Sequence, residues 1–233
     1  MKIIILCGGK GTRLSEETRK IPKPMVKIGP EPILVHIINY YKSYGFNNFI
    51  LAVGYKGKII RNYFKKKKYQ QSVRVINTGL NTLTGGRLLR LKKLFNRNED
   101  FMFTYGDGLT TLNLNKLLLF HKKNKKIATM TVVKPPARFG EVILKNEIVK
   151  KFKEKPQHSQ GWINGGFFVL NSKIFQYIKN DQTMFEREPL LKLVKKKQLV
   201  AFKYNGFWKC MDTLRDKILL NEFWKNKKGP WKI

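Results

Sequence analysis

Residues 2–14 read Lys2-Ile3-Ile4-Ile5-Leu6-Cys7-Gly8-Gly9-Lys10-Gly11-Thr12-Arg13-Leu14, an apolar run that passes directly into glycines. The run predicts a first β-strand over 2–7. Glycines after a strand let backbone N–H groups approach a phosphate closely, and Thr12 and Arg13 add a hydroxyl and a guanidinium donor. The spacing differs from a Walker loop and matches only part of G-x-G-x-x-G, so an ordinary strand-to-helix turn is an equal alternative on the pattern alone.

The rest of the chain alternates strand-like and helix-like stretches, which is typical of an α/β fold with a doubly wound, mostly parallel, Rossmann-like sheet. Runs rich in Ile, Val and Phe predict further strands over 48–53, 73–76, 101–104, 128–133, 163–170 and 199–203. Apolar residues at helical spacing predict helices over 32–44, 57–68, 87–95, 113–123, 185–196 and 213–225.

The 233 residues are enough for one large domain or two small ones, and no linker separates two halves. We therefore predict a single domain over residues 1–233. Its middle differs from the rest, because short strands over 142–144 and 148–152 are separated only by 145–147. This pattern predicts a β-hairpin inserted at about 135–156.

The charge balance is strongly basic, with 48 Lys and Arg against 15 Asp and Glu and a formal net charge of +33. A positive field attracts nucleic acid, an anionic membrane or phosphorylated metabolites. The lysines occur in separate runs along the whole chain, which favours solvated faces over a dedicated nucleic-acid surface.

No apolar run approaches the roughly 20 residues that cross a bilayer, so we expect no membrane association. The first apolar run is too short for a signal peptide and lacks a small-residue cleavage site, which predicts a cytoplasmic protein. Cys7 and Cys210 fit neither a paired metal-ligand spacing nor a disulfide framework.

Ten residues after Arg13 stands Pro22-Lys23-Pro24-Met25. Proline restricts its own φ and the backbone of the residue before it, so Lys23 leaves the chain in a nearly fixed direction. Such a lysine suits phosphate binding, although an isolated P-K-P is more often a surface feature.

The glycine stretch and the P-K-P segment resemble the G-G-x-G-T-R-L and P-K-P signature of the sugar-1-phosphate nucleotidylyltransferases. Six further segments stand in the order of that family: Ser15-Glu16-Glu17-Thr18, Thr84-Gly85-Gly86-Arg87-Leu88, Phe103-Thr104-Tyr105-Gly106-Asp107-Gly108, Arg138-Phe139-Gly140, Trp162-Ile163-Asn164-Gly165-Gly166-Phe167-Phe168 and Met211-Asp212-Thr213-Leu214-Arg215-Asp216. The resemblance implies CTP and glucose 1-phosphate as substrates and CDP-glucose and pyrophosphate as products. UTP, dTTP or another hexose 1-phosphate is the alternative within the family, and a nucleic-acid-binding protein is the alternative of another class.

Such a reaction needs no general base, because a phosphate monoester with a second pKa of about 6 is already ionised at neutral pH. It needs alignment of two polyanions and neutralisation of charge. The resemblance assigns these catalytic tasks to Arg13 and Lys23. It assigns nucleotide binding to Leu6, Cys7, Gly8, Gly9, Lys10, Gly11, Thr12, Thr82, Arg87 and Gly106. Arg87 would donate to the cytosine, although it can equally hold a helix end.

Asp107 lies between two glycines just past the predicted strand 101–104, at the carboxyl end where ligands bind in this architecture. Asp212 follows the run 207–210 in the same way, and Mg²⁺ prefers few carboxylates together with phosphates and water. Either aspartate alone can be a turn or helix-capping residue. The resemblance makes them the Mg²⁺ pair.

The segment Glu154-Lys155-Pro156 is similar to an E-K-P motif of the family, which implies that Glu154 holds sugar hydroxyls and Lys155 the sugar phosphate. Asn164 adds a sugar contact by the same resemblance, while Glu186 and Glu188 are equally well explained as solvated helix starts. The resemblance further implies a homo-oligomer, although the connection over 65–72 is shorter than in similar chains.

Overall fold

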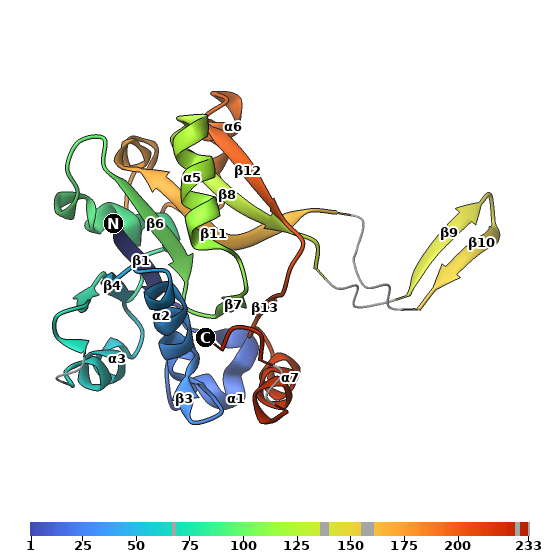
Figure 1. Ribbon diagram of the computed structural model, residues 1–233, viewed down its shortest axis with the longest axis horizontal. Helices are drawn as coiled ribbons and strands as arrows, with labels where there is room; N and C mark the ends of the chain where they lie inside the picture. Colours follow the sequence, from blue (N-terminus) through green and yellow to red (C-terminus); the bar gives the residue numbers. More distant parts are fainter. Residues whose placement is uncertain (67–68, 136–139, 155–160, 227–228, 233) are drawn as a thin grey trace.

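A computed structural model describes residues 1–66, 69–135, 140–154, 161–226 and 229–232, and its main element is a seven-stranded sheet (Figure 1). The strands lie in the order β12-β8-β11-β6-β1-β4-β5. Their bounds are β1 (Lys2–Cys7), β4 (Asn48–Val53), β5 (Val73–Asn77), β6 (Asp100–Tyr105), β8 (Ala128–Val133), β11 (Ile163–Asn171) and β12 (Leu199–Tyr204). Strand β11 is antiparallel to both neighbours and every other pair is parallel, so the expected mostly parallel sheet is confirmed.

Helices cover both faces of this sheet. Their bounds are α2 (Ile33–Ser43), α3 (Gly57–Phe64), α4 (Thr84–Arg90), α5 (Leu114–Asn124), α6 (Glu188–Lys195) and α7 (Leu214–Lys225). Single turns lie at η1 (Thr12–Leu14), α1 (Ser15–Thr18), η2 (Lys23–Met25), η4 (Lys92–Leu94) and η5 (Ser172–Tyr177). The helix predicted over 87–95 was wrong in its bounds, because α4 begins three residues earlier and ends at Arg90.

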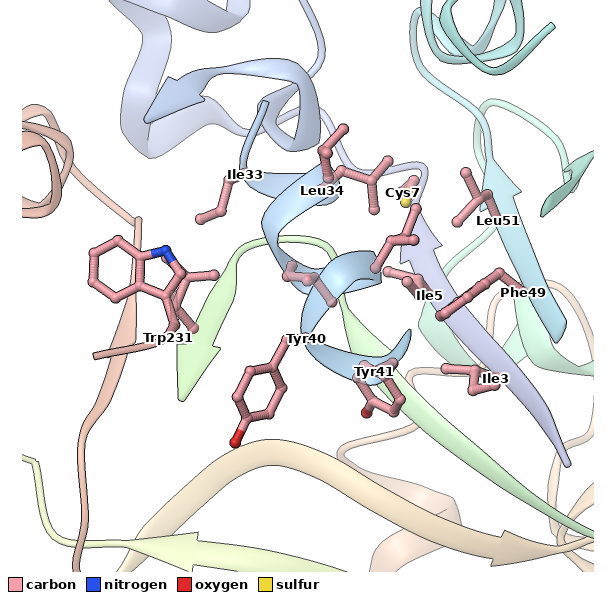
Figure 2. Packing of buried hydrophobic residues seen from close by; sticks show 14 of the residues in the cluster. Ile3, Ile5, Cys7, Ile33, Leu34, Tyr40, Tyr41, Phe49, Leu51 and Trp231 are labelled. Atoms are coloured by element: carbon pink, nitrogen blue, oxygen red, sulfur yellow. The ribbon is translucent and has the colours of Figure 1, made fainter. Parts of the chain in front are cut away.

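The two cores follow from the alternation of side chains along the strands. In β1, Ile3 and Ile5 belong to the cluster under α2, α3, α5 and α7, which Figure 2 shows around Tyr41 and Phe49. Ile4 belongs to the opposite cluster, under α4, α6 and η5. Such a strand is apolar on both faces, which explains why residues 2–7 carry no polar alternation.

The remaining strands form small antiparallel pairs: β2 (Lys27–Ile28) with β3 (Glu31–Pro32), β7 (Gly108–Thr110) with β13 (Trp208–Cys210), and β9 (Glu141–Lys145) with β10 (Ile148–Lys153). The last pair is the predicted hairpin, and it projects away from the rest of the chain (Figure 1). Its Val142, Ile143, Ile148 and Val149 side chains are exposed.

Within the described part of the chain, no helix combines the length and the apolar character that a membrane crossing requires.

The pairing of β7 with β13 positions the candidate site. Gly108 lies opposite Cys210, and the Met211 amide donates to the carbonyl of Asp107 at 2.9 Å. The residues just outside this ribbon, Asp107 before β7 and Asp212 after β13, are therefore brought together although the chain separates them widely. Asp107 lies beyond the carboxyl end of β6 and lines the same hollow as the glycines that follow β1.

Candidate active site

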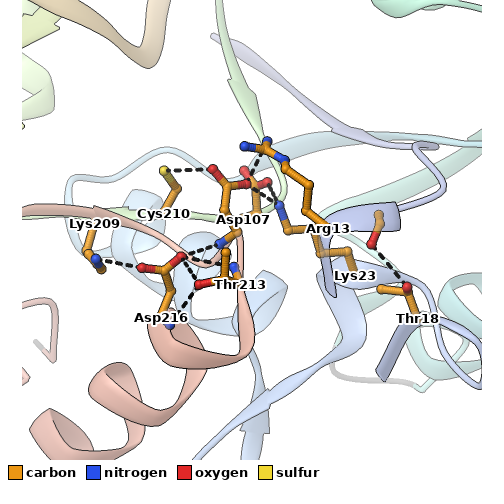
Figure 3. A network of polar contacts seen from close by, with 10 residues as sticks. Arg13, Thr18, Lys23, Asp107, Lys209, Cys210, Thr213 and Asp216 are labelled. Carbon is orange, nitrogen blue, oxygen red and sulfur yellow. Dashed lines mark hydrogen bonds and ion pairs between the residues drawn. The ribbon is translucent and has the colours of Figure 1, made fainter. Parts of the chain in front are cut away.

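Asp107 and Asp212 share one cation, the ammonium group of Lys23 (Figure 3). The Lys23 Nζ lies 2.5 Å from Asp107 Oδ2 and 2.7 Å from Asp212 Oδ1. The two carboxylate oxygens consequently cannot be farther apart than the sum of those distances. The fold therefore brings the proline-flanked lysine into contact with two aspartates that are remote from it in the chain.

Lys23 is held rigidly at this position. Pro22 has an extended backbone and Pro24 is buried inside the single turn η2, so both neighbours fix the direction of the lysine side chain. The Lys23 side chain is 11% exposed. Burial alone would lower the pKa of Lys23, but the charges and hydrogen bonds of Asp107 and Asp212 outweigh it and raise the pKa above its ordinary value. Lys23 is therefore a permanent positive charge.

Arg13 adds a second cation on the open side of the same group. Its Nη2 lies 2.9 Å from Asp212 Oδ1, and 70% of its side chain is exposed. The turn that carries it follows Gly11, whose φ of 67° is in the left-handed region. The Thr18 hydroxyl stabilises this turn by donating to the carbonyls of Gly11 and Leu14 at 3.1 and 2.9 Å.

Asp212 does not cap α7, so the capping role expected as one alternative for this residue was wrong. The cap is Thr213, whose hydroxyl accepts from the Asp216 amide at 3.3 Å. Asp216 in turn accepts from the backbone N–H groups of Asp212 and Thr213 at 3.1 and 2.9 Å, and its other oxygen pairs with Lys209 at 2.7 Å. This network orients the Asp212 backbone and leaves its carboxylate free to face Lys23 and Arg13.

A pocket of about 400 Å³ opens beside Lys23 at the carboxyl ends of β1 and β6. Parallel α/β sheets bind ligands at such ends, where the strand order reverses. Nine of the ten expected nucleotide-binding residues line it: Leu6, Cys7, Gly8, Gly9, Gly11, Thr12, Thr82, Arg87 and Gly106. The tenth, Lys10, is exposed and lies outside the lining.

Arg87 lies at the wall of this pocket, but its terminal nitrogens already bind the protein. It donates to the carbonyls of Gly8 and Gly79 at 2.9 and 2.7 Å and to the Thr78 hydroxyl at 2.8 Å. A Cβ on Gly8 would lie only 2.2 Å from its guanidinium. Arg87 thus links the glycine loop after β1 to the segment after β5 through hydrogen bonds. This structural role differs from both roles expected from the sequence.

A second pocket of about 350 Å³ adjoins the first and shares Arg13, Tyr105 and Asp107 with it. Asn164 lines this second pocket, as expected for a sugar contact, and its Oδ1 accepts from the Gly166 amide at 2.8 Å. The sequence indicated no role for two side chains that line this pocket, Tyr105 and Trp208. The Trp208 indole N–H donates to the Gly165 carbonyl at 2.7 Å.

The sequence led to the same prediction for Glu186 and Glu188, but the two side chains lie in different surroundings. Glu186 lines the second pocket and accepts hydrogen bonds from the hydroxyls of Tyr105 and Thr84, the latter at 2.6 Å. Glu188 forms surface ion pairs with Lys179 and Lys192, both at 2.9 Å. The sequence carried no signal for the difference, because both glutamates stand at the start of the same predicted helix over 185–196.

Of the expected E-K-P segment, the structure describes only Glu154. This residue follows β10, is exposed, and lines neither pocket. Lys155 lies outside the described residues. The sugar-binding roles of both residues stay predictions.

This arrangement defines a class of protein. Residues 2–223 match the family model described as Nucleotidyl transferase, and the chain belongs to that family.

Among its curated relatives, the glucose-1-phosphate cytidylyltransferase of Salmonella typhimurium is 43% identical over 254 aligned positions, which cover 100% of this chain and 99% of the relative. A probable glucose-1-phosphate cytidylyltransferase of Bacillus subtilis is 40% identical and covered completely. A solved structure of HddC from Yersinia pseudotuberculosis complexed with GMP-PN has a TM-score of 0.74 at 26% identity and covers 96% of this chain and 99% of that one.

The family generally uses a divalent metal ion, and the donor set of this site fits one. Mg²⁺ is typically bound by one or two carboxylates together with substrate phosphates and water. Asp107 and Asp212 supply two carboxylates that already converge on a single cation, the ammonium of Lys23. Among the described residues, no cluster of three His, Cys, Asp or Glu side chains is able to hold a metal by itself.

Proposed function

We propose that this protein transfers the cytidylyl group of CTP to glucose 1-phosphate and produces CDP-glucose and pyrophosphate. Two lines of argument support the substrates. The Salmonella and Bacillus relatives that align over the whole chain carry this activity in their names. The two adjoining pockets share a wall at Arg13 and Asp107, as the transfer of a group between two bound molecules requires.

In the proposed reaction, a phosphate oxygen of glucose 1-phosphate attacks the α-phosphorus of CTP and pyrophosphate leaves from the opposite side. Lys23 and Arg13 bind the triphosphate and neutralise the charge that grows on the leaving group. Lys23 is rigid and mostly buried, whereas Arg13 is exposed and free to change partner. Asp107 and Asp212 would hold Mg²⁺, which supplies charge neutralisation to the phosphate oxygens when bound.

Among the described residues, the site contains cations that can position two polyanions. No histidine lines either pocket among the described residues. The nearby thiols are unreactive, because burial and the charges of Asp107 and Asp212 raise the pKa of Cys210 to about 12, and burial raises the pKa of Cys7 as well. An attacking phosphate that is already ionised fits such a site.

We assign the glycine pocket to the nucleotide and the second pocket to the sugar phosphate. Backbone N–H groups after β1 suit phosphate oxygens. Thr82 and Arg87 line the same pocket, and we propose that the base binds beside them. Asn164, with Glu154 and Lys155 of the E-K-P segment, is our proposed set for glucose 1-phosphate. We further propose that residues 1–233 act as one domain, a view supported by the single sheet with a core on each face.

The contact of Lys23 with both aspartates is the observation that carries this proposal. The test is a panel of CTP, UTP, dTTP, GTP and ATP against glucose, mannose and galactose 1-phosphates, with pyrophosphate release as the readout. We expect release with CTP and glucose 1-phosphate to exceed every other pair. Preference for another nucleotide would show that the protein is a nucleotidyltransferase with a different base specificity. No pyrophosphate release with any pair would reject the proposal.

The other expectations remain predictions: a homo-oligomer, a cytoplasmic location, and no specific binding of nucleic acid. The alternative of a nucleic-acid-binding protein predicts affinity that falls steeply with salt and no pyrophosphate release.

A further inference from the structure

A second concave region lies at the opposite end of the central sheet. It has a volume of about 780 Å³ and includes Asp100, the first residue of β6, whereas the active-site pockets are lined by Thr104 and Tyr105 at the other end of that strand. Four to five residue steps of about 3.3 Å each separate the two regions by roughly 13–17 Å. None of its lining residues belongs to either active-site pocket. We call it the basic cavity.

Its lysines come from three separate segments of the chain. Two segments are the ends of α5 and α6 with the residues that follow them, and the third is the start of η5. The lining lysines are Lys122, Lys125, Lys126, Lys173 and Lys196. Their convergence depends on the fold, because the sequence alone places them in three unrelated runs.

These lysines have little to neutralise them. In the described part of the chain, none of the five lies in an ion pair. The lining contains one carboxylate, Asp100, which accepts from the Asn171 amide at 2.7 Å and lies 3.5 Å from His121 Nε2. Asp100 is therefore turned toward its own neighbours.

A simpler explanation is that lysines collect at helix carboxyl ends, where the macrodipole favours them. Each such end carries only about half a negative charge, and two ends meet here, so five lysines exceed what the dipoles require. Lys173 lies at the beginning of a helical turn, where a dipole would disfavour it. The helix dipoles therefore do not account for all five lysines, and the positive charge that remains would favour an anion.

The cavity also has an apolar part. Tyr177 is half-buried, and the Lys196 ammonium lies 5.4 Å from its ring centroid. Ile127 is half-buried on the wall. A volume of 780 Å³ is within the range of small-molecule sites, and it exceeds what inorganic phosphate would fill.

We propose that the basic cavity binds a small organic phosphate, with its phosphate groups on the lysines and its organic part against Tyr177 and Ile127. The class includes nucleotides and sugar phosphates. This proposal does not depend on the proposed reaction, because the cavity shares no residue with the active site.

The first test measures the protection of individual lysines from acetylation. Lysine amines are acetylated at 150 mM salt in the presence of increasing concentrations of CTP, pyrophosphate or cytidine, and the extent of acetylation at each lysine is quantified by mass spectrometry. We expect CTP to protect Lys125, Lys173 and Lys196 at least fivefold with one common midpoint, and cytidine to protect none. Exposed Lys93, Lys116 and Lys225 are the internal controls.

Three outcomes are informative. Equal protection by pyrophosphate and CTP would show that the cavity recognises the polyphosphate alone. The proposed anion site would then stand, and the proposed contact of the organic part with Tyr177 and Ile127 would be rejected. Uniform weak protection of cavity and control lysines would mean screening of a basic surface and would overturn the proposal. Protection by a short single-stranded oligonucleotide alone, extending to the control lysines, would overturn it in favour of a nucleic-acid surface.

The second test uses two variants of equal charge. Lys125→Gln/Lys173→Gln/Lys196→Gln removes three cavity charges, and Lys93→Gln/Lys116→Gln/Lys225→Gln removes three exposed charges elsewhere. By calorimetry we expect two CTP sites in the unaltered protein and the control, and about tenfold weaker binding at one of them in the cavity variant. A single CTP site in all three proteins would overturn the proposal. Pyrophosphate release should continue in both variants, which separates this result from a failure of the proposed function.

Discussion

Replacing Lys23 by alanine is the sharpest test of the candidate active site. The change removes the only cation among the described residues that contacts both Asp107 and Asp212. Loss of one preorganised electrostatic group at a developing charge typically lowers kcat by about 10²- to 10³-fold, or about 2.7–4 kcal/mol. We expect a loss of that size in pyrophosphate release from CTP and glucose 1-phosphate.

The effect of Lys23→Ala on folding should be smaller. Removing one partner of a fully buried ion pair costs about 3–5 kcal/mol. Here the Asp107 side chain is 25% exposed, and Asp212 keeps its contact with Arg13 at 2.9 Å. Solvent and the remaining cation compensate part of the charge, so we expect the free energy of unfolding to fall by about 1–3 kcal/mol. Urea unfolding at pH 7 measures it.

The raised pKa of Lys23 also predicts how the difference in unfolding free energy between the unaltered protein and Lys23→Ala depends on pH. The aspartates hold the folded-state pKa of Lys23 above 10.5 against the opposing effect of burial. A raised lysine pKa contributes stability that is fully present below the unfolded value and is lost as the pH rises through the folded value. The difference between the two proteins should therefore be constant from pH 7 to 9. The matched control is Lys20→Ala, which alters an exposed lysine nearby. Turnover of Lys23→Ala within threefold of this control would refute the assigned role.

Three further changes test other parts of the site. Gly8→Ala places a Cβ 2.2 Å from the Arg87 guanidinium and should lower kcat/KM for CTP at least tenfold, whereas Gly9→Ala meets nothing within 4 Å and should be nearly neutral; equal losses would contradict the assigned packing. Asp107→Asn should abolish most Mn²⁺ binding in electron paramagnetic resonance with little change in melting temperature, and retained binding would reject the carboxylate pair. Burial raises the pKa of Asp216, but Lys209 and Thr213 outweigh it and lower the pKa below 3.8. Its stabilisation is thus present above about pH 4 and lost as the pH falls through the folded value. Asp216→Asn should therefore cost about 1–3 kcal/mol in urea unfolding at pH 7, and this cost should shrink as the pH falls further below 3.8.

Much of the central sheet could be predicted because both its faces are buried. The runs 2–7, 48–53 and 128–133 were correct in both bounds, since an apolar strand between polar turns is a strong local signal. The pairs β2–β3 and β7–β13 were missed, because two or three residues leave no periodicity to read. The antiparallel direction of β11 was also invisible, since strand direction depends on the connection through the hairpin and not on the strand itself.

The sequence indicated candidate site residues where the chemistry demands a particular residue type. It did not indicate contacts that depend on how distant segments meet in the fold. Lys23 and the two aspartates were identified individually, and their meeting depends on the short ribbon that was missed. The resemblance assigned Arg87 to the cytosine, with a helix end as the alternative, but its terminal nitrogens donate to three oxygens of the protein itself. Only coordinates reveal such competition, because unpaired backbone carbonyls leave no trace in a sequence.

The position of Lys23 explains how a strongly basic chain can keep two aspartates ready for a polyanion. Two carboxylates in contact with one ammonium form a group with little net repulsion, so the pair is stable before any substrate arrives. A bound triphosphate would compete with the aspartates for Lys23 and Arg13, and the aspartates would then need another cation. Such an exchange of partners at Lys23 would link the arrival of the substrate to the binding of a metal ion. In Lys23→Ala this link should be lost, so Mn²⁺ affinity without nucleotide should rise even as turnover falls.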